Sequence, residues 1–221
     1  DFCLSRGLGD VYKRQLLTRL IANNIPVILT GPSASGKTFL LRRAAELTGT
    51  KLWILTITSS TTVKDVLDHL FKMCTIKRYI SGHVLESTCT KMYVCFKYLD
   101  LASDSVLELL RVLVSRRSFW HSFKRNGKLG NQQIKLAASI LFFATTHDTT
   151  LLPEDLTRHF DIVQCQVPSI QDLESICSLI LNDVVDMLVV DKMIRTFKKM
   201  EQIFEGSNLA INPRDLIRWV I

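Results

Sequence analysis

Short apolar runs alternate with longer amphipathic segments over most of the chain. Five of the runs have the length and the β-branched or aromatic content of buried strands. They cover residues 26–30, 52–58, 93–96, 140–144 and 161–167. Apolar residues at helical spacing lie between them, at 39–47, 63–74 and 106–116, and the polar residues 59–62 are suited to cap the second of these helices. Strands alternating with helices predict an α/β fold whose five-stranded parallel sheet is sandwiched by helices and binds ligands at the carboxyl ends of its strands.

From residue 168 onward the spacing of apolar residues is helical throughout. The helical segments cover 170–181, 184–204 and 213 onward. We expect a large αβα domain over residues 16–167 and a small helical lid domain over 168–221. The last segment runs into Ile221 with no capping glycine or proline, so we expect the lid to be incomplete and the chain to be part of a longer one.

The first fifteen residues have a different character. Residues 3–15 resemble a translated sequencing-adaptor peptide, and we interpret residues 1–15 as non-native sequence to be left out of fold reasoning. The alternative is a native N-terminal helix.

Eight consecutive residues between the first strand and the first helix complete the pattern G-x-x-x-x-G-K-[ST]. They are Gly31, Pro32, Ser33, Ala34, Ser35, Gly36, Lys37 and Thr38. The glycines let successive backbone N–H groups converge on one anion, and the helix that continues from Phe39 points its positive end at the same anion. Lys37 would reach the outer phosphates, and the Thr38 hydroxyl would bind Mg²⁺. Because a strand precedes the loop and a helix follows it, we predict an ATP or ADP site with Mg²⁺ here rather than a chance turn.

Composition narrows the possibilities further. With 47% hydrophobic and 22% charged residues the chain is an ordinary globular one, and no apolar run is long enough to cross a bilayer. The net charge is +7, but the basic residues are spread along the chain without interleaved aromatics, so we expect no direct nucleic-acid contact. The six cysteines form no C-x-x-C pair and the five histidines are scattered. We therefore expect reduced thiols and no zinc site, and we assign the histidines no chemistry.

The order of the motifs resembles an AAA+ ATPase module: phosphate loop, third strand, polar-tipped fourth strand, arginine before the fifth strand, then helical lid. Segments 109–111 with 119–120, 157–160 and 212–220 are similar to characteristic stretches of dynein heavy chains. Together they resemble the third AAA+ module of a cytoplasmic dynein. Segments 40–44, 58–63 and 96–100 favour the intraflagellar-transport branch.

The resemblance implies two acidic residues at the end of the third strand, the first holding magnesium through water and the second polarising the attacking water. Here those places are occupied by Lys97 and Tyr98. Asp100 lies two residues beyond the second place, and moving it into the first requires a three-residue shift that would turn over the alternating faces of the strand. Asp100 is therefore a doubtful magnesium ligand. Lys97 would either offset phosphate charge or stay solvated.

Two further roles follow from the resemblance on the large domain. Thr146, next to Thr145, occupies the place of the residue that senses the γ-phosphate, with a plain strand-end turn as the alternative. Arg158 matches an arginine finger that binds the nucleotide of the next module, because its planar fork suits phosphate oxygens. The alternative for Arg158 is an ion pair with Glu154 or Asp155.

A third role falls in the lid. Arg214 matches the lid arginine that folds over the phosphates. The alternative is an ordinary helix opening, since Pro213 stands at a helix start.

The function that the resemblance implies is regulatory. ATP or ADP would set the angle between large domain and lid, and neighbouring AAA+ modules of the same heavy chain would pass that angle to the main hydrolytic site. Hydrolysis at this module would be weak or absent. Dynein subunits and microtubules would be contacted by other parts of the parent chain, in the cytoplasm and cytoskeleton or in a cilium or flagellum.

Three alternatives stay open. The module could be an active ATPase completed by Asp100 or a neighbour. It could be a stand-alone P-loop kinase or signalling NTPase, against which the helical lid argues. It could also be a structural ring segment whose pocket is empty.

Overall fold

The computed structural model describes part of the chain. The described residues are 18, 21–73, 84–86, 92–125, 128–136, 139–167, 169, 171–173, 187–204, 213 and 215–216. The chain divides into two compact units. One contains Leu16–Thr30 and Lys37–Gln164, and the other contains Gly31–Gly36 and Cys165–Ile221. Predicted positions such as 1–15, most of 170–181 and Arg214 lie outside the described residues.

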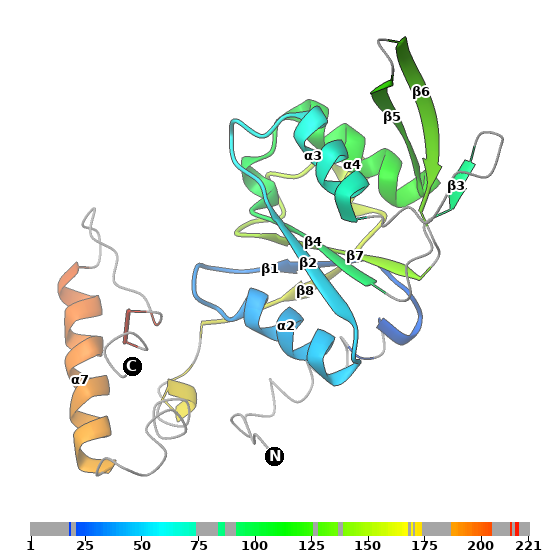
Figure 1. The fold of residues 1–221 in the computed structure, drawn as a ribbon. Coiled ribbons are helices and arrows are strands. Elements are labelled where there is room, and N and C mark those ends of the chain that lie inside the picture. The colour runs from blue at the N-terminus through cyan, green and yellow to red at the C-terminus, as the bar shows by residue number, and fades with distance from the viewer. Residues whose placement is uncertain are drawn as a thin grey trace. The chain divides into compact units, whose positions relative to one another are not determined.

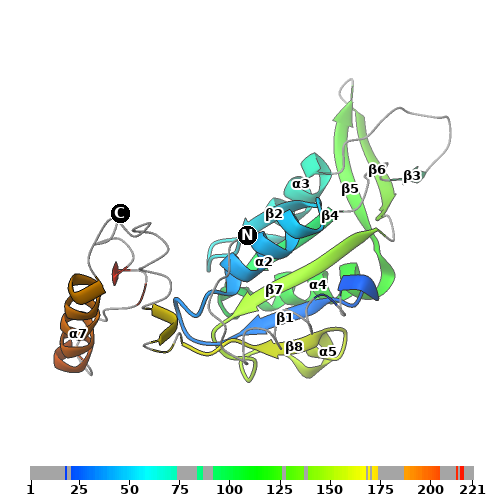
Figure 2. The ribbon, with the colours of Figure 1, turned by 90° about the horizontal axis from the view of Figure 1, so that it is seen from below.

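The first unit is built on a five-stranded parallel sheet. Its strands are β1 (Val27–Thr30), β2 (Lys51–Thr56), β4 (Met92–Lys97), β7 (Ile140–Thr146) and β8 (Asp161–Gln164). They lie in the order β2-β4-β7-β1-β8, and every neighbouring pair is parallel. Figure 2 shows β7, β1 and β8 side by side. The five predicted strands are confirmed, with ends that differ by up to three residues.

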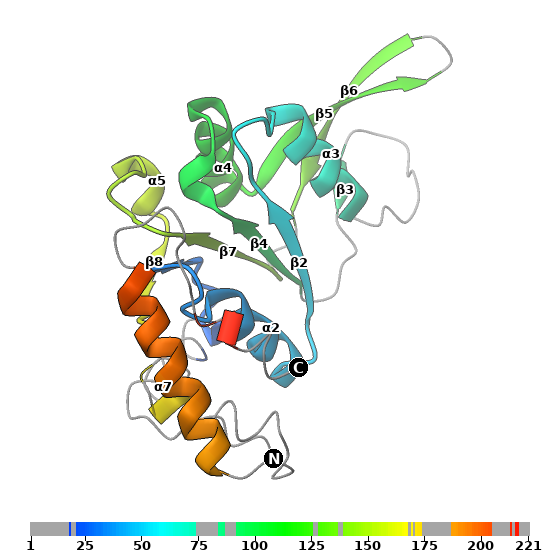
Figure 3. The same ribbon diagram turned by 90° about the vertical axis from the view of Figure 1, so that its left-hand side faces the viewer.

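Helices cover both faces of this sheet, as the sequence predicted. They are α2 (Lys37–Leu47), α3 (Val63–Met73), α4 (Asp104–Arg116) and the single-turn α5 (Glu154–Thr157). Figures 1 and 3 show α2 on one face and α3 with α4 on the other. The longer helices form because apolar residues recur on one side of each, as at Val106, Leu110 and Leu113 of α4, all of which are buried.

The two central strands supply apolar side chains to both faces, because successive residues of a strand point in opposite directions. On the α3 and α4 side, the rings of Phe96 and Phe142 stack with centroids 6.0 Å apart. On the other side Tyr93 and Phe143 meet edge to face at 5.3 Å. The Tyr93 hydroxyl donates to Oγ1 of Thr48 at 3.0 Å, which ties this face to the end of α2. The centre of the sheet is therefore buried on both sides.

A second sheet was not predicted. Strands β5 (Ser118–Arg125) and β6 (Lys128–Lys135) pair in antiparallel register, and β3 (Val84–Glu86) adds to β6 in parallel. Residues 119–120, which resemble a dynein segment, lie in β5, where the sequence predicted no strand. In the sequence, the dipeptide Asn126-Gly127 between β5 and β6 is typical of a two-residue hairpin.

The predicted cap of α3 is confirmed. Backbone N of Thr62 donates to Oδ2 of Asp65 at 2.9 Å, and backbone N of Asp65 donates to Oγ1 of Thr62 at 3.2 Å. This reciprocal pair satisfies N–H groups at the helix start that have no partner within the helix. Hydrogen bonds from the Thr62 hydroxyl and backbone also lower the pKa of Asp65 below its ordinary value.

The second unit contains α7 (Met187–Phe204) and its own small apolar core. Val190, Ile194 and Phe197 recur at helical spacing and are buried with Leu173 and Leu216. The described residues after 168 are thus helical where they form regular structure, as predicted. None of the described helices has both the length and the hydropathy needed to cross a bilayer.

Candidate functional site

The predicted phosphate loop joins β1 to α2. Its backbone enters the left-handed region at Gly31, Ala34 and Gly36, with φ of 141°, 61° and 80°. Backbone N of Ser35 donates to the carbonyl of Pro32 at 3.4 Å, closing a turn within the loop. Such alternation of backbone hand turns successive N–H groups toward a common point, which is the geometry of an anion nest.

The helix that follows is suited to an anion at its start. Lys37 is the first residue of α2, Thr38 is the second, and both are half-buried. The first turn of α2 contains no acidic residue, so no side-chain carboxylate of that turn neutralises the positive end of the helix dipole. Phe39 is 56% exposed, so its ring is available to a ligand or a neighbouring chain.

The third strand of the prediction, β4, ends in the register that the sequence indicated. Lys97 pairs with Thr56 of β2 and with Thr145 of β7, so the strand shows no three-residue shift. Tyr98 follows in the left-handed region, with φ 62° and ψ 54°. The Lys97 ammonium lies over the Tyr98 ring, 4.5 Å from its centroid. Lys97 is therefore engaged by an aromatic face.

Asp100 lies beyond the strand, in the 3₁₀ turn η1 (Leu99–Leu101), and its partner is a histidine. Its Oδ2 is 2.9 Å from Nδ1 of His147, the first residue after β7. The His147 ring also stacks on Tyr98, with centroids 5.8 Å apart and planes 5° from parallel. Lys97, Tyr98, His147 and Asp100 thus form one contiguous group, which we call the edge cluster.

The sequence did not indicate the contacts of His147, and the expectation that the histidines carry no chemistry stays a prediction. The available signal was a histidine directly after the polar tip of the fourth strand. Parallel pairing of β4 with β7 brings the two strand ends together, although 47 residues separate Asp100 from His147.

The Asp100 carboxyl is held in its charged form. Burial raises its pKa, but the hydrogen bond from the His147 side chain, with smaller contributions from backbone N–H groups of Asp100 and His147, outweighs burial and lowers the pKa below the ordinary 3.8. The side chain is only 9% exposed, against 42% for His147. Oδ1 is buried and has no well-formed hydrogen bond within the described part of the chain.

The threonines at the end of β7 are buried and bonded. Thr146, the predicted sensor, is 1% exposed, and its hydroxyl donates to the carbonyl of Asp148 at 2.8 Å. Oγ1 of Thr145 accepts from backbone N of Tyr98 at 3.3 Å, which links β7 to the edge cluster. The Thr30 hydroxyl, one residue before the phosphate loop, donates to the carbonyl of His147 at 3.3 Å. The strand-end turn that was the alternative for Thr146 is thus present, and the sensing role stays a prediction.

Arg158, the predicted finger, lies at the C-terminal end of α5 and is largely exposed. Its Nη2 is 3.4 Å from Asp155 and 3.8 Å from Glu154, as the structural alternative for this residue required. These pairs are solvent-exposed and therefore weak, so they leave the guanidinium able to exchange partners. The finger role stays a prediction.

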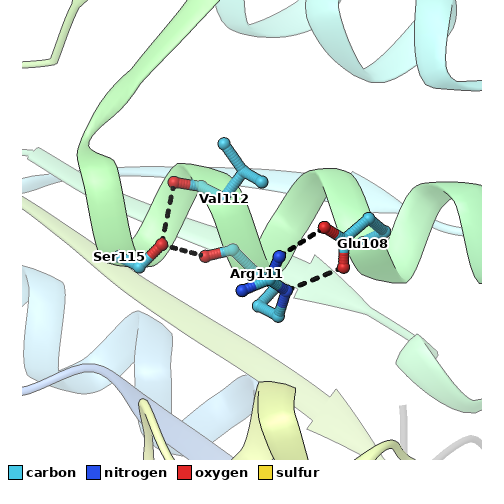
Figure 4. A network of polar contacts seen from close by, with 4 residues as sticks. All are labelled: Glu108, Arg111, Val112 and Ser115. Carbon is cyan, nitrogen blue, oxygen red and sulfur yellow. Dashed lines mark hydrogen bonds and ion pairs between the residues drawn. The ribbon is translucent and has the colours of Figure 1, made fainter.

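Arg111, part of one dynein-like segment, forms its ion pair within its own helix, α4. Its Nε donates to Oε2 of Glu108 at 2.7 Å in a two-pronged ion pair along α4 (Figure 4). The hydroxyl of Ser115 donates to the carbonyl oxygens of Arg111 and Val112 in the next turn. In this structure Arg111 therefore contacts its own helix.

The fit to magnesium is partial. The described residues contain no group of three or more His, Cys, Asp or Glu side chains that could hold a metal ion. Magnesium commonly uses one or two carboxylates together with substrate phosphates, and Oδ2 of Asp100 is taken by His147. Thr38, the second residue of α2, stays the predicted hydroxyl ligand, and Asp100 stays a doubtful ligand because one of its two carboxylate oxygens already binds His147.

Comparison with known proteins agrees with this architecture. Residues 26–160, more than half of the chain, match the family described as AAA domain (dynein-related subfamily). Among solved structures, a point mutant of RuvB from Thermotoga maritima is similar at a TM-score of 0.57 and 15% identity. That match covers 96% of this chain and 69% of the RuvB chain. At this identity the likeness to RuvB shows the fold alone.

Proposed function

The chain belongs to the dynein-related subfamily of AAA domains, and we propose that it is a nucleotide-binding regulatory module with weak hydrolysis of its own. It is an AAA+ ATPase-type module, and an AAA+ fold implies nucleotide binding, usually with Mg²⁺. The observation that carries the proposal is the contrast between the two strand ends. The phosphate loop after β1 is complete, whereas β4 ends at Lys97 and is followed by Tyr98.

The first half of the contrast supports binding. The loop backbone is nest-shaped, the first turn of α2 has no acidic residue, and Lys37 adds a cation as the first residue of that helix. ATP or ADP is the ligand that these features suit, held by Gly31 to Phe39 with Thr38 as the protein's ligand to magnesium.

The second half supports slow turnover. In phosphoryl transfer the protein mainly positions the reactants and stabilises charge, and a side chain must orient the attacking water. Neither a lysine nor a tyrosine at the end of β4 supplies a carboxylate for that task. The position of Asp100 beyond the end of β4, in η1, supports the same proposal.

The finer identity rests on the dynein-like segments. We propose a module of a dynein heavy chain motor ring, most similar to the third AAA+ module and, within the dyneins, to the intraflagellar-transport branch. Its partners would be the adjoining AAA+ modules, with Arg158 as a finger and Arg214 as a lid arginine. Dynein subunits and microtubules would be reached through other parts of the parent chain. The corresponding location is the cytoplasm and cytoskeleton, or a cilium.

The test measures nucleotide binding and phosphate release on the same protein. Wild type should retain ATP, and Lys37→Ala should weaken retention by at least about tenfold because it removes the cation on the outer phosphates. Tyr98→Glu should raise phosphate release, with Tyr98→Phe as the matched control that keeps the ring and adds no carboxylate. Absence of ATP and ADP binding in wild type would contradict the proposal, and so would multiple-turnover hydrolysis at a rate ordinary for AAA+ ATPases.

A further inference from the structure

We propose that His147, held by Asp100, is the residue through which this module carries out its residual ATP hydrolysis. The inference rests on the proposed function, since it requires ATP at the predicted site. His147 would be the catalytic residue that orients the attacking water and accepts its proton. Asp100 would be a positioning residue that acts only through His147.

The first argument is the location of the His147 imidazole. His147 packs face to face against Tyr98, which occupies the place where the family resemblance puts the water-polarising carboxylate. His147 also directly follows Thr146, the predicted γ-phosphate sensor, and its carbonyl accepts from Thr30 at the end of β1. The imidazole therefore lies beside the position where the resemblance expects the catalytic carboxylate, at the carboxyl edge where parallel sheets bind ligands.

The second argument is the orientation of the His147 imidazole. Asp100 lies 2.9 Å from Nδ1 of His147, and a carboxylate there accepts a hydrogen bond from Nδ1–H, so Nε2 is the ring nitrogen left to meet water. The Tyr98 ring restrains the plane of the imidazole. The His147 side chain is 42% exposed, so the ring is accessible to water. A histidine oriented by a carboxylate is a general base in many unrelated sites.

The buried Oδ1 of Asp100 supports a functional arrangement. An acceptor that is buried without a well-formed hydrogen bond lowers stability, and such groups need an explanation beyond packing. The Oδ1 atom without a well-formed bond is explained if the carboxylate is placed for its contact with His147 rather than for packing.

The chemical step balances with water and ATP alone. The oxygen of a water molecule forms a bond to the γ-phosphorus while one water proton passes to Nε2 of His147. The bond between the γ-phosphorus and the β,γ-bridging oxygen breaks, and ADP leaves with its electron pair. The proton on Nε2 then returns to solvent, which leaves ADP, phosphate and neutral His147.

The experiment is single-turnover phosphate release from ATP bound to the full chain. His147→Ala should lower the rate by about 100-fold, the low end of what a positioned base contributes, with the dissociation constant for ATP unchanged. Added imidazole should restore part of the rate in His147→Ala. His69→Ala, which removes a histidine of α3, should leave the rate unchanged and should not respond to imidazole.

Asp100→Asn tests the positioning role. It should lower the rate in wild type by about tenfold or more but leave the His147→Ala variant unaffected, since residues that act as a unit are not additive. A structural role would instead weaken ATP binding and give no rescue by imidazole.

The outcomes separate the two proposals. ATP retention with no phosphate release in wild type, or full release in His147→Ala, would overturn the role of His147 and leave nucleotide regulation standing. Failure of ATP to bind at all would overturn the proposed function as well.

Discussion

The carbonyl oxygen of Cys165 lies 2.0 Å from the point where a β-carbon on Gly31 would be. The first glycine of the phosphate loop is therefore required for two separate reasons. Its φ of 141° is one that other residues rarely adopt, and the space that a side chain needs is filled by rigid backbone. The chain that follows β8 thus fixes the first residue of the loop.

Gly31→Ala should abolish ATP binding and lower the melting temperature, because either the loop or the Cys165 backbone must move. Gly49→Ala is the matched control, since Gly49 also has positive φ, at 59°, but has open space around it. Gly49→Ala should lower the free energy of unfolding by only about 1–2 kcal/mol, the penalty for a side chain in the left-handed region, and should leave ATP binding intact. Thermal unfolding with and without ATP measures both effects. Equal decreases of the melting temperature and of ATP binding in the two variants would show that the contact between Gly31 and Cys165 is not important.

The Cys95 thiol should be unreactive in the folded protein. Burial raises its pKa to about 12, although Lys97 opposes the shift, so the reactive thiolate is scarce at neutral pH. Iodoacetamide at about pH 8, near the ordinary pKa of a thiol, should leave Cys95 unmodified in the native chain and alkylate it fully in denaturant. Mass spectrometry of the Cys95 peptide measures the difference. Rapid native labelling would mean that the centre of the sheet opens readily.

The Asp100–His147 pair should make the free energy of unfolding depend on pH in the acidic range. Because the folded pKa of Asp100 lies below its ordinary 3.8, the pair stabilises the fold above that pH, and the contribution is lost as pH falls through the folded value. The difference in unfolding free energy between wild type and Asp100→Asn should therefore be largest near neutral pH and shrink below about pH 4.

Urea titrations at several pH values measure this difference. In a His147→Ala background the effect of Asp100→Asn should be smaller, because the main partner is already missing. A difference that stays constant with pH would mean that the carboxylate contributes nothing through its charge.

The centre of the sheet was predictable because β1, β4 and β7 are buried on both faces. Such strands appear in the sequence as continuous apolar runs, and the run from Ile140 to Ala144 is fully buried as predicted. The hairpin of β5 and β6 was harder, because it contains polar residues such as His121, Ser122 and Gln132 and no continuous apolar run. Only its Asn-Gly dipeptide indicated it.

The phosphate loop was predictable as a local pattern, whereas the edge cluster was not. Its members come from two strand ends, and they meet only because β4 and β7 are neighbours in the sheet. The left-handed backbone of Tyr98 then turns its ring onto His147. Neither the sheet order nor that backbone angle follows from residue spacing, so the position of His147 after the fourth strand was a signal that the sequence could not connect with Asp100.

The last prediction separates the two interpretations of Thr146. Thr146→Val removes a hydroxyl that donates to the Asp148 carbonyl, which should cost about 0.5–1.5 kcal/mol without ATP. If Thr146 also senses the γ-phosphate, ATP should stabilise this variant less than wild type, by about 1.4 kcal/mol for each tenfold loss of affinity. Thr145→Val is the matched control, because Thr145 is equally buried and its hydroxyl binds Tyr98 instead. We expect the stabilisation by ATP to fall in Thr146→Val and to persist in Thr145→Val. Equal stabilisation by ATP in both variants would reduce Thr146 to a strand-end turn residue.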